Sequence, residues 1–267
     1  GGYELFFDKN PKKLNQIDHI NSVLKPLFSK DIFNINNKKI KKFGFNTNMV
    51  NHLVQNSFEG QLNTGKLMRA LRTKLNKEDI SFFSNTELTD FETNSNKNQL
   101  LINLKNQKFN LTCNKLAICN NAFAAQILPN FNIKPGRGLI ILTKPFSKLS
   151  IKGSFHYDRG FYYFRNIENR ILFGGGRNLD FKKEETIEFG INKKIKNKLI
   201  TDLDKFIIPE HKIEIDMEWS GIMAFGKSKI PIIKRESNSV AVGIKSSGMG
   251  VAIGGYVGKS VANILLD

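Results

Sequence analysis

The C-terminal run of a buried strand, a glycine-rich loop and a helix restricts the fold of this chain most. Residues 239–243 (Ser-Val-Ala-Val-Gly) predict the strand, residues 246–250 the loop, and residues 252–266 a helix lined with small side chains. Gly248 and Gly250 allow the backbone to come close to a ligand, and the positive end of the helix points at it. This order of elements is typical of α/β folds and predicts a site for an electron-rich group.

The length and composition describe a folded protein without a membrane span. The chain has 267 residues, of which 40% are hydrophobic and 24% charged, so it has one large domain or two modest ones. It has no run of eighteen apolar residues, and its start, Gly-Gly-Tyr-Glu-Leu-Phe-Phe-Asp, does not resemble a signal peptide. We therefore expect a soluble, cytoplasmic protein.

Metal chemistry has little support in the residue types. The two cysteines, Cys113 and Cys119, lack the Cys-x-x-Cys spacing of a zinc site, and the four histidines are scattered. We expect neither a metal site nor a disulfide framework.

The net charge of +17, from 41 Lys+Arg against 24 Asp+Glu, raises a nucleic-acid-binding protein as an alternative. The lysines are dispersed among Asn and Ile, as in residues 36–42 and 192–198, and no nucleic-acid motif accompanies them. This pattern favours a solvated surface, so we expect no nucleic-acid partner and keep nucleic-acid binding as the weaker alternative.

Hydrophobic periodicity predicts the remaining elements. The N-terminal part has a strand at residues 4–7, a helix at 12–28 and then a basic, Asn-rich segment of modest order, followed by a helix at 64–75 that Thr64 caps. A second amphipathic helix is predicted at 185–203. The predicted strands are 80–83, 100–104, 109–112, 116–119, and an antiparallel group at 138–143, 160–165 and 170–174, with a turn at 94–98.

Several stretches resemble the D-amino-acid-oxidase-like family of FAD-dependent oxidoreductases, which includes glycine oxidase and sarcosine oxidase. They are residues 59–67 (Glu-Gly-Gln-Leu-Asn-Thr-Gly-Lys-Leu), residues 116–123 (Leu-Ala-Ile-Cys-Asn-Asn-Ala-Phe), the segment from Trp219-Ser-Gly to Ile233, the hairpin at 161–177, and the terminal strand with its glycine loop. Their order and spacing extend through nearly the whole chain, so the combined match is much more specific than any one stretch.

The resemblance implies a two-part α/β plus α+β fold. Residues 61–128 and 223–267 would form an incomplete Rossmann-like FAD domain, and residues 1–60 and 129–222 a substrate domain on an antiparallel or mixed sheet. Family members begin with a strand, a G-x-G-x-x-G turn and a helix that hold the FAD diphosphate, and we expect the chain to lack such a segment before Gly1. We therefore expect weak FAD binding, and a non-catalytic remnant of the family is the main alternative.

The resemblance also implies which residues contact a non-covalent FAD. The loop residues would pass the pyrimidine edge of the flavin; they are Ser247, Gly248, Met249, Gly250 and Val251. The turn of Cys119, Asn120 and Asn121 would lie near the phosphate and ribose, and Leu88 near the adenine. Cys119 can equally be a small buried residue that ends a strand.

The substrate side departs from the family. Met223 replaces the arginine that pairs with a substrate carboxylate in glycine-oxidase-type enzymes, so a simple α-amino acid requires Arg165 or Arg177 to supply the charge, although a structural role is the commoner one for each. Tyr163 is a further candidate for the substrate pocket, and Trp219 a packing residue.

The implied reaction is oxidation of a carbon–nitrogen bond in a small amine or amino-acid derivative, by hydride transfer to the flavin. Gly221 stands where sarcosine oxidase carries the cysteine joined to its flavin, and Leu172 replaces that enzyme's oxygen-activating lysine. The electron acceptor is therefore open. The sequence shows no paired carboxylates and no Ser-His-Asp set, so we assign no catalytic residue.

Overall fold

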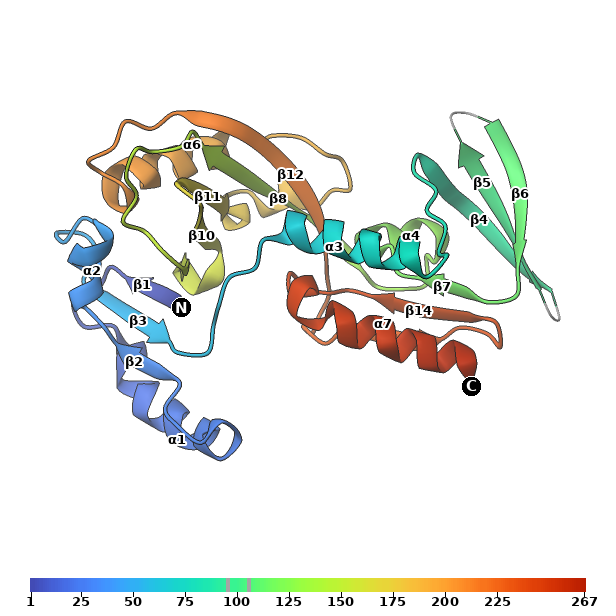
Figure 1. Cartoon of the computed structure of the whole chain (residues 1–267), viewed down its shortest axis with the longest axis horizontal. Helices are drawn as coiled ribbons and strands as arrows, with labels where there is room; N and C mark the ends of the chain where they lie inside the picture. Colours follow the sequence, from blue (N-terminus) through green and yellow to red (C-terminus); the bar gives the residue numbers. More distant parts are fainter. Residues whose placement is uncertain (95–96, 105–106) are drawn as a thin grey trace. The chain divides into compact units, whose positions relative to one another are not determined.

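The chain folds into two compact units, each built from separate stretches of sequence (Figure 1). The computed structural model describes residues 1–94, 97–104 and 107–267. Unit 1 contains Gly1–Asn63, Gly138–Lys182 and Phe189–Gly221. Unit 2 contains Thr64–Arg137, Lys183–Glu188 and Ile222–Asp267.

Unit 1 contains most of a mixed eight-stranded sheet, in the order β12-β8-β11-β10-β9-β1-β3-β2; the start of β8 and the end of β12 belong to unit 2. Its strands are β1 (Gly2–Phe6), β2 (Phe33–Ile35), β3 (His52–Asn56), β8 (Lys134–Thr143), β9 (Ser154–Tyr157), β10 (Tyr162–Ile167), β11 (Arg170–Gly175) and β12 (Ile215–Phe225). Strand β1 runs parallel to β9, whereas β9, β10, β11 and β8 are successively antiparallel. The helices of this unit are α1 (Ile17–Phe28), α2 (Lys38–Phe43) and α6 (Lys193–Asp202).

The core of unit 1 covers one face of this sheet. Alternate residues of β9 and β10 point to this face, where the rings of Phe155 and Phe164 stack with centroids 4.8 Å apart. Ile195 and Leu199 of α6 are buried in the same cluster. Because side chains alternate along a strand, the residues between them, such as Tyr163, lie on the opposite face.

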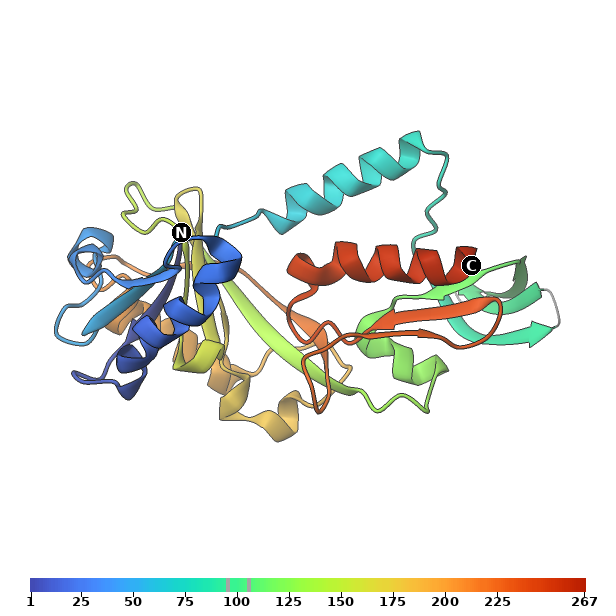
Figure 2. The same ribbon diagram turned by 90° about the horizontal axis from the view of Figure 1, so that it is seen from below.

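Unit 2 contains two three-stranded sheets. The first has the order β13-β14-β7, with β7 (Leu116–Ile118) parallel to β14 (Val240–Ile244) and β13 (Ile232–Arg235) antiparallel to β14. Helix α7 (Gly250–Leu266) lies alongside β14 (Figure 2). The second sheet is antiparallel and consists of β4 (Thr86–Asn94), β5 (Lys97–Leu104) and β6 (Gln107–Cys113). Helices α3 (Thr64–Lys77), α4 (Ala124–Ile127) and α5 (Phe181–Glu184) complete the described elements.

The predicted C-terminal strand, loop and helix are confirmed, as are the helix from Thr64 and the antiparallel group of strands. The predicted helix at 12–28 forms as a 3₁₀ turn (Lys12–Gln16) followed by α1. The basic, Asn-rich segment is better ordered than expected, because it forms α2 and β3. The central part of the predicted turn at 94–98, residues 95–96, lies outside the described residues.

Two predicted elements are wrong in whole or in part. Residues 80–83 form no strand: Ile80 and Phe83 are exposed, and no neighbouring strand pairs with this stretch. The helix predicted at 185–203 begins only at Lys193, because the Asn192 side chain accepts hydrogen bonds from the backbone N–H groups of Lys194 and Ile195 and so caps the helix there.

Two further findings bear on function. None of the helices in the described stretches is long and apolar enough to cross a membrane. Across residues 1–94, 97–104 and 107–267, no group of three or more His, Cys, Asp or Glu side chains could hold a metal ion.

A buried ion pair at the start of β8 provides a test of the packing in unit 2. Nε and Nη2 of Arg137 donate hydrogen bonds to the two carboxylate oxygens of Glu184, whose side chain is 1% exposed. Arg137→Met removes both of these charge-assisted bonds from a buried carboxylate and is expected to lower the free energy of unfolding by about 3–5 kcal/mol. Urea denaturation followed by circular dichroism measures the change.

The neighbouring pair of Lys134 and Glu185 is the matched control, because both side chains are exposed. Lys134→Met is expected to change the free energy of unfolding by about 0–1 kcal/mol. If both variants lose the same free energy of unfolding, the burial of Glu184 does not determine how much the ion pair stabilises the chain.

Candidate functional site

The loop between β14 and α7 has a left-handed backbone. The φ angles of Lys245, Ser247 and Gly248 are 63°, 49° and 80°. Only glycine adopts such angles without cost, so two of the three residues are held there by their surroundings. We call residues 245–249 the glycine loop.

Neighbouring segments hold the glycine loop by hydrogen bonds. The backbone N–H of Ser246 donates to Oδ1 of Asn121 at 3.1 Å, and the N–H of Ser247 donates to the carbonyl of Ala224 at 3.1 Å. Asn121, which follows β7, is itself left-handed with φ 54°. The structure therefore brings the end of β7 together with the glycine loop.

A glycine on β14 allows α7 to pack closely behind this loop. A Cβ atom on Gly243 would lie 2.6 Å from Val261 Cγ2 and 2.8 Å from Val257 Cγ1. Both valines are buried between the helix and the strand. Because Gly243 has no side chain, α7 can pack close to β14, and this position directs the N-terminus of α7 at the glycine loop.

The N-terminal end of α7 has the properties of a site for an electron-rich group. Its N-cap residue, Met249, provides no side-chain hydrogen bond, and the first N–H groups of a helix have no partner within the helix. The helix dipole places partial positive charge at the same point. The hydroxyl Oγ of Ser247 is buried and has no partner. These groups fit the electron-rich pyrimidine edge of a flavin.

The other predicted cofactor residues divide into two groups. Cys119 and Asn120 directly precede Asn121, and Cys119 is exposed and lies next to Gly243, so it is not a buried strand end. Leu88 lies on β4, where it pairs with Ile102 in the other sheet of unit 2. Its place near an adenine stays a prediction.

Met223 lies beside the glycine loop. Its Sδ atom is 3.8 Å from the position of a Cβ on Gly248. Both residues belong to unit 2. A methionine here provides soft apolar contact, not the charge that a carboxylate needs.

Strand β10 presents two of the predicted substrate residues on the sheet face opposite the core of unit 1. Tyr163 is 38% exposed, and desolvation raises the pKa of its phenol. Arg165 donates to the carbonyl of Leu62, and desolvation lowers the pKa of its guanidinium. In the described part of the chain no carboxylate forms an ion pair with Arg165, so its charge is available to a ligand.

The sequence did not predict one residue of this face, His156. His156 on β9 pairs with Tyr163 across the strands, and its Nδ1 is buried without a partner. Alternation along β9, in which Phe155 and Tyr157 are buried in the core, could have placed His156 on the same face as Tyr163.

The remaining predicted residues do not join this group. Arg177 lies on a 3₁₀ turn, with its guanidinium 4.9 Å from the ring centroid of Phe181. Trp219 on β12 is 39% exposed, so it is not the packing residue that was predicted.

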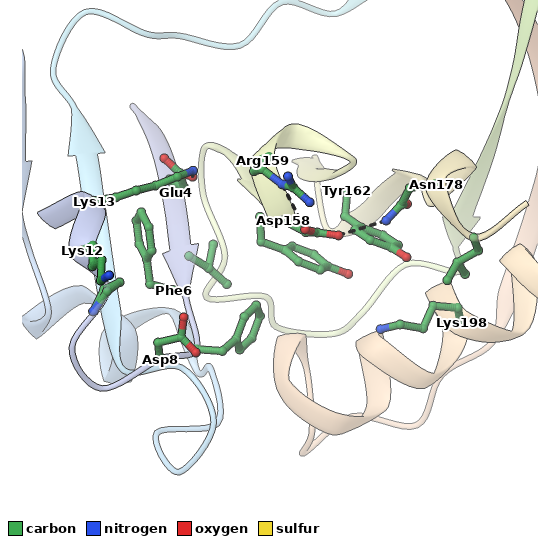
Figure 3. Close-up of a pocket in the computed structure, with 15 residues that line it drawn as sticks. Glu4, Phe6, Asp8, Lys12, Lys13, Asp158, Arg159, Tyr162, Asn178 and Lys198 are labelled. Atoms are coloured by element: carbon green, nitrogen blue, oxygen red, sulfur yellow. Dashed lines mark hydrogen bonds and ion pairs between the residues drawn. The ribbon is translucent and has the colours of Figure 1, made fainter. Parts of the chain in front are cut away.

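Unit 1 also has a cavity of about 730 Å³ on the core side of its sheet, between the end of β1 and the β9–β10 hairpin (Figure 3). Its charged groups largely neutralise one another: Lys13 pairs with Glu4, and Lys198 pairs with the buried Asp202. Figure 3 shows Arg159 turned toward Asp158. The other two charged residues of the lining, Asp8 and Lys12, have opposite signs, so the cavity carries little net charge.

Two stacked tyrosines form the wall of this cavity. The rings of Tyr157 and Tyr162 have centroids 4.7 Å apart, and the hydroxyl of Tyr157 donates to Oδ2 of Asp202 at 2.5 Å. Burial raises the pKa of Tyr157, and the Asp202 carboxylate adds to that shift. Burial likewise raises the pKa of Tyr162 to about 12.

Comparison with known proteins agrees with this description. The family model "FAD dependent oxidoreductase" (DAO) matches residues 45–264. No curated protein sequence matches the chain. Among solved structures, L-proline dehydrogenase from P. horikoshii has 16% sequence identity and a TM-score of 0.78; the alignment covers 99% of this chain and 71% of that one.

Two further solved structures have the same fold. Glycine oxidase from Bacillus cereus aligns with a TM-score of 0.79 at 14% identity, over 99% of this chain and 72% of that one. Iminodiacetate oxidase from Chelativorans sp. aligns with a TM-score of 0.72 at 14% identity, over 100% and 72%.

The eight-stranded sheet of unit 1 and the two three-stranded sheets of unit 2 thus form the mixed α/β fold that these solved structures share. The chain belongs to the DAO family of FAD-dependent oxidoreductases, because the family model matches more than half of it.

The contact between Gly243 and α7 gives a test of how the glycine loop is supported. Gly243→Ala forces a Cβ against Val257 and Val261 and is expected to lower the free energy of unfolding by about 1–3 kcal/mol. Gly254→Ala is the control within α7, because nothing lies within 4 Å of its Cβ position. It is expected to stabilise the chain by up to about 1 kcal/mol. Urea denaturation measures both, and a Gly243→Ala variant as stable as the parent would contradict the close packing.

The raised pKa of Tyr162 predicts a dependence on alkaline pH. The phenol ionises near pH 10 in the unfolded chain but only near pH 12 when folded, so its share of the stability is complete below about pH 10 and is lost as the pH rises towards 12. In Tyr162→Phe the free energy of unfolding should therefore fall less steeply over this interval. Urea denaturation at a series of pH values measures the slope, and an unchanged slope would refute the assignment.

Proposed function

We propose that this chain is an FAD-dependent oxidoreductase that oxidises the carbon–nitrogen bond of a small amine or amino-acid derivative. The observation that carries the proposal is the glycine loop: a left-handed turn, a buried unpartnered hydroxyl on Ser247 and a helix N-terminus come together in a chain of the DAO family. We assign unit 2 to the cofactor and unit 1 to the substrate.

FAD, when bound, accepts a hydride from the carbon next to the substrate nitrogen. The residues proposed to hold it are the loop positions 247–251, supported by Asn121 with Cys119 and Asn120 beside it, and Leu88 at the adenine. The N–H groups at the N-terminus of α7 and the dipole of this helix would stabilise negative charge on the reduced cofactor. Gly221 offers no thiol for covalent attachment, so the FAD is held non-covalently.

On the substrate side, we assign the carboxylate contact to Arg165. A guanidinium pairs well with a carboxylate, and this one is partly desolvated and has no acidic partner in the described residues. Tyr163 provides a polar contact two residues earlier on the same face of β10. Arg177 and Met223 remain weaker candidates, and Leu172, in the place of the oxygen-activating lysine, leaves the electron acceptor open.

The relatives provide the first substrates to test. Their names point to L-proline, glycine and iminodiacetate, which all contain a carbon–nitrogen bond beside a carboxylate. The test mixes the purified chain with FAD, removes free FAD by gel filtration and follows flavin bleaching by each compound without oxygen. Retained flavin that one of them bleaches supports the proposal. A chain that retains no FAD would be a non-catalytic family member.

Arg165→Met tests the carboxylate contact. Loss of one charge-assisted pair is expected to raise the substrate concentration needed for half-maximal bleaching by about 10- to 100-fold, without loss of bound FAD. Arg159→Met, on the exposed tip of the β9–β10 hairpin, is the control and should behave like the parent. If Arg165→Met leaves the substrate affinity unchanged, a residue other than Arg165 contacts the substrate carboxylate.

A further inference from the structure

Lys245, the first residue of the glycine loop, has an unusual environment for a lysine. It is only 5% exposed, although lysine is among the residues least often buried. Its backbone is left-handed, with φ 63°, which glycine tolerates far better than lysine. A long charged side chain in this position requires specific contacts to hold it there.

The contacts of the Lys245 ammonium are all neutral oxygens. Nζ donates to the carbonyl of Ser228 at 2.8 Å and to the carbonyl of Ile230, and it lies 3.5 Å from the Ser228 hydroxyl. These acceptors belong to the exposed segment between β12 and β13, which we call the 226–230 segment. Within residues 1–94, 97–104 and 107–267, no carboxylate forms an ion pair with Lys245.

Gly226 makes room for the stem of this side chain. A Cβ atom there would lie 2.8 Å from Cδ of Lys245 and 3.6 Å from its Cε. The aliphatic part of Lys245 thus passes directly over the backbone of Gly226 before its ammonium reaches the two carbonyls. A glycine, a buried lysine and two backbone acceptors therefore link the glycine loop to the 226–230 segment.

We propose that Lys245 is a positioning residue for the cofactor site: it holds the glycine loop in its left-handed conformation and supplies a positive charge that no carboxylate cancels. This inference rests on the proposed function for its cofactor. A cation that is poorly solvated and unpaired contributes positive potential to its surroundings, which favours a negatively charged reduced flavin. Backbone dipoles alone would lack this charge.

Substitutions at position 245 separate the charge from the packing. Lys245→Met keeps most of the stem over Gly226 but removes the charge and the donors. It is expected to weaken FAD binding by about tenfold and to shift the flavin midpoint potential to a more negative value. Lys245→Arg restores a cation and should recover most of both properties. Lys259→Met removes an exposed charge of α7 and should change neither. FAD fluorescence quenching and redox titration measure the two quantities.

A flavin-independent measurement keeps this inference distinct from the proposed function. Amide hydrogen exchange of residues 246–251 is expected to be faster in Lys245→Met than in the parent, Lys245→Arg or Lys259→Met. If the parent binds no FAD, the proposed function fails, and exchange alone decides whether Lys245 holds the loop. Unchanged exchange would overturn the positioning role, and unchanged FAD affinity and potential would overturn the electrostatic one.

A second variant covers the case in which Lys245→Met does not fold. Gly226→Ala pushes a methyl group against the lysine stem from the other side and leaves the charge in place. It should speed exchange in residues 246–251 to a smaller degree, with a smaller loss of FAD affinity. Exchange as slow as in the parent would contradict the link between the two segments.

Discussion

The close contact between β14 and α7 is the constraint on which the candidate site depends. Gly243 has no side chain, and the two valines of α7 occupy the space that a Cβ atom would need. The helix therefore begins within a few residues of the strand end, and the chain between them must turn sharply through left-handed angles. The packing of α7 against β14 therefore determines where the first N–H groups of α7 point, and no single polar contact does so.

The glycine loop is supported from three directions. Asn121 holds it from the end of β7, Ala224 from the end of β12, and Lys245 from the 226–230 segment. These contacts join the loop to Asn121 and to the stretch 224–230, which are both distant from it in the sequence, so the loop conformation is a property of the folded unit 2. Such fixed donors need no reorganisation when charge develops on a ligand.

Successive side chains of β9 and β10 lie on opposite faces of the sheet in unit 1, so the two faces have different residues. Aromatic rings fill the covered face, where Phe155, Phe164 and the tyrosine pair are buried. The other face carries Tyr163, Arg165 and His156, whose polar groups have few partners within the protein. One strand thus contributes both to the stability of the unit and to its candidate substrate contacts.

The sequence by itself determined the order of elements and the family. Helical and alternating periodicities are local properties, so the C-terminal strand, loop and helix and the β10–β11 hairpin were predictable from residue spacing. The prediction from periodicity was wrong at residues 80–83, whose apolar run pairs with no neighbouring strand. It was also wrong at the start of α6, because the cap at Asn192 begins the helix later than the amphipathic pattern indicates. Only the tertiary structure showed that Lys245 is buried over Gly226, that Arg165 has no acidic partner among the described residues and that Met223 adjoins the glycine loop. These facts depend on contacts between segments far apart in the sequence, and no local pattern of residues encodes such distances.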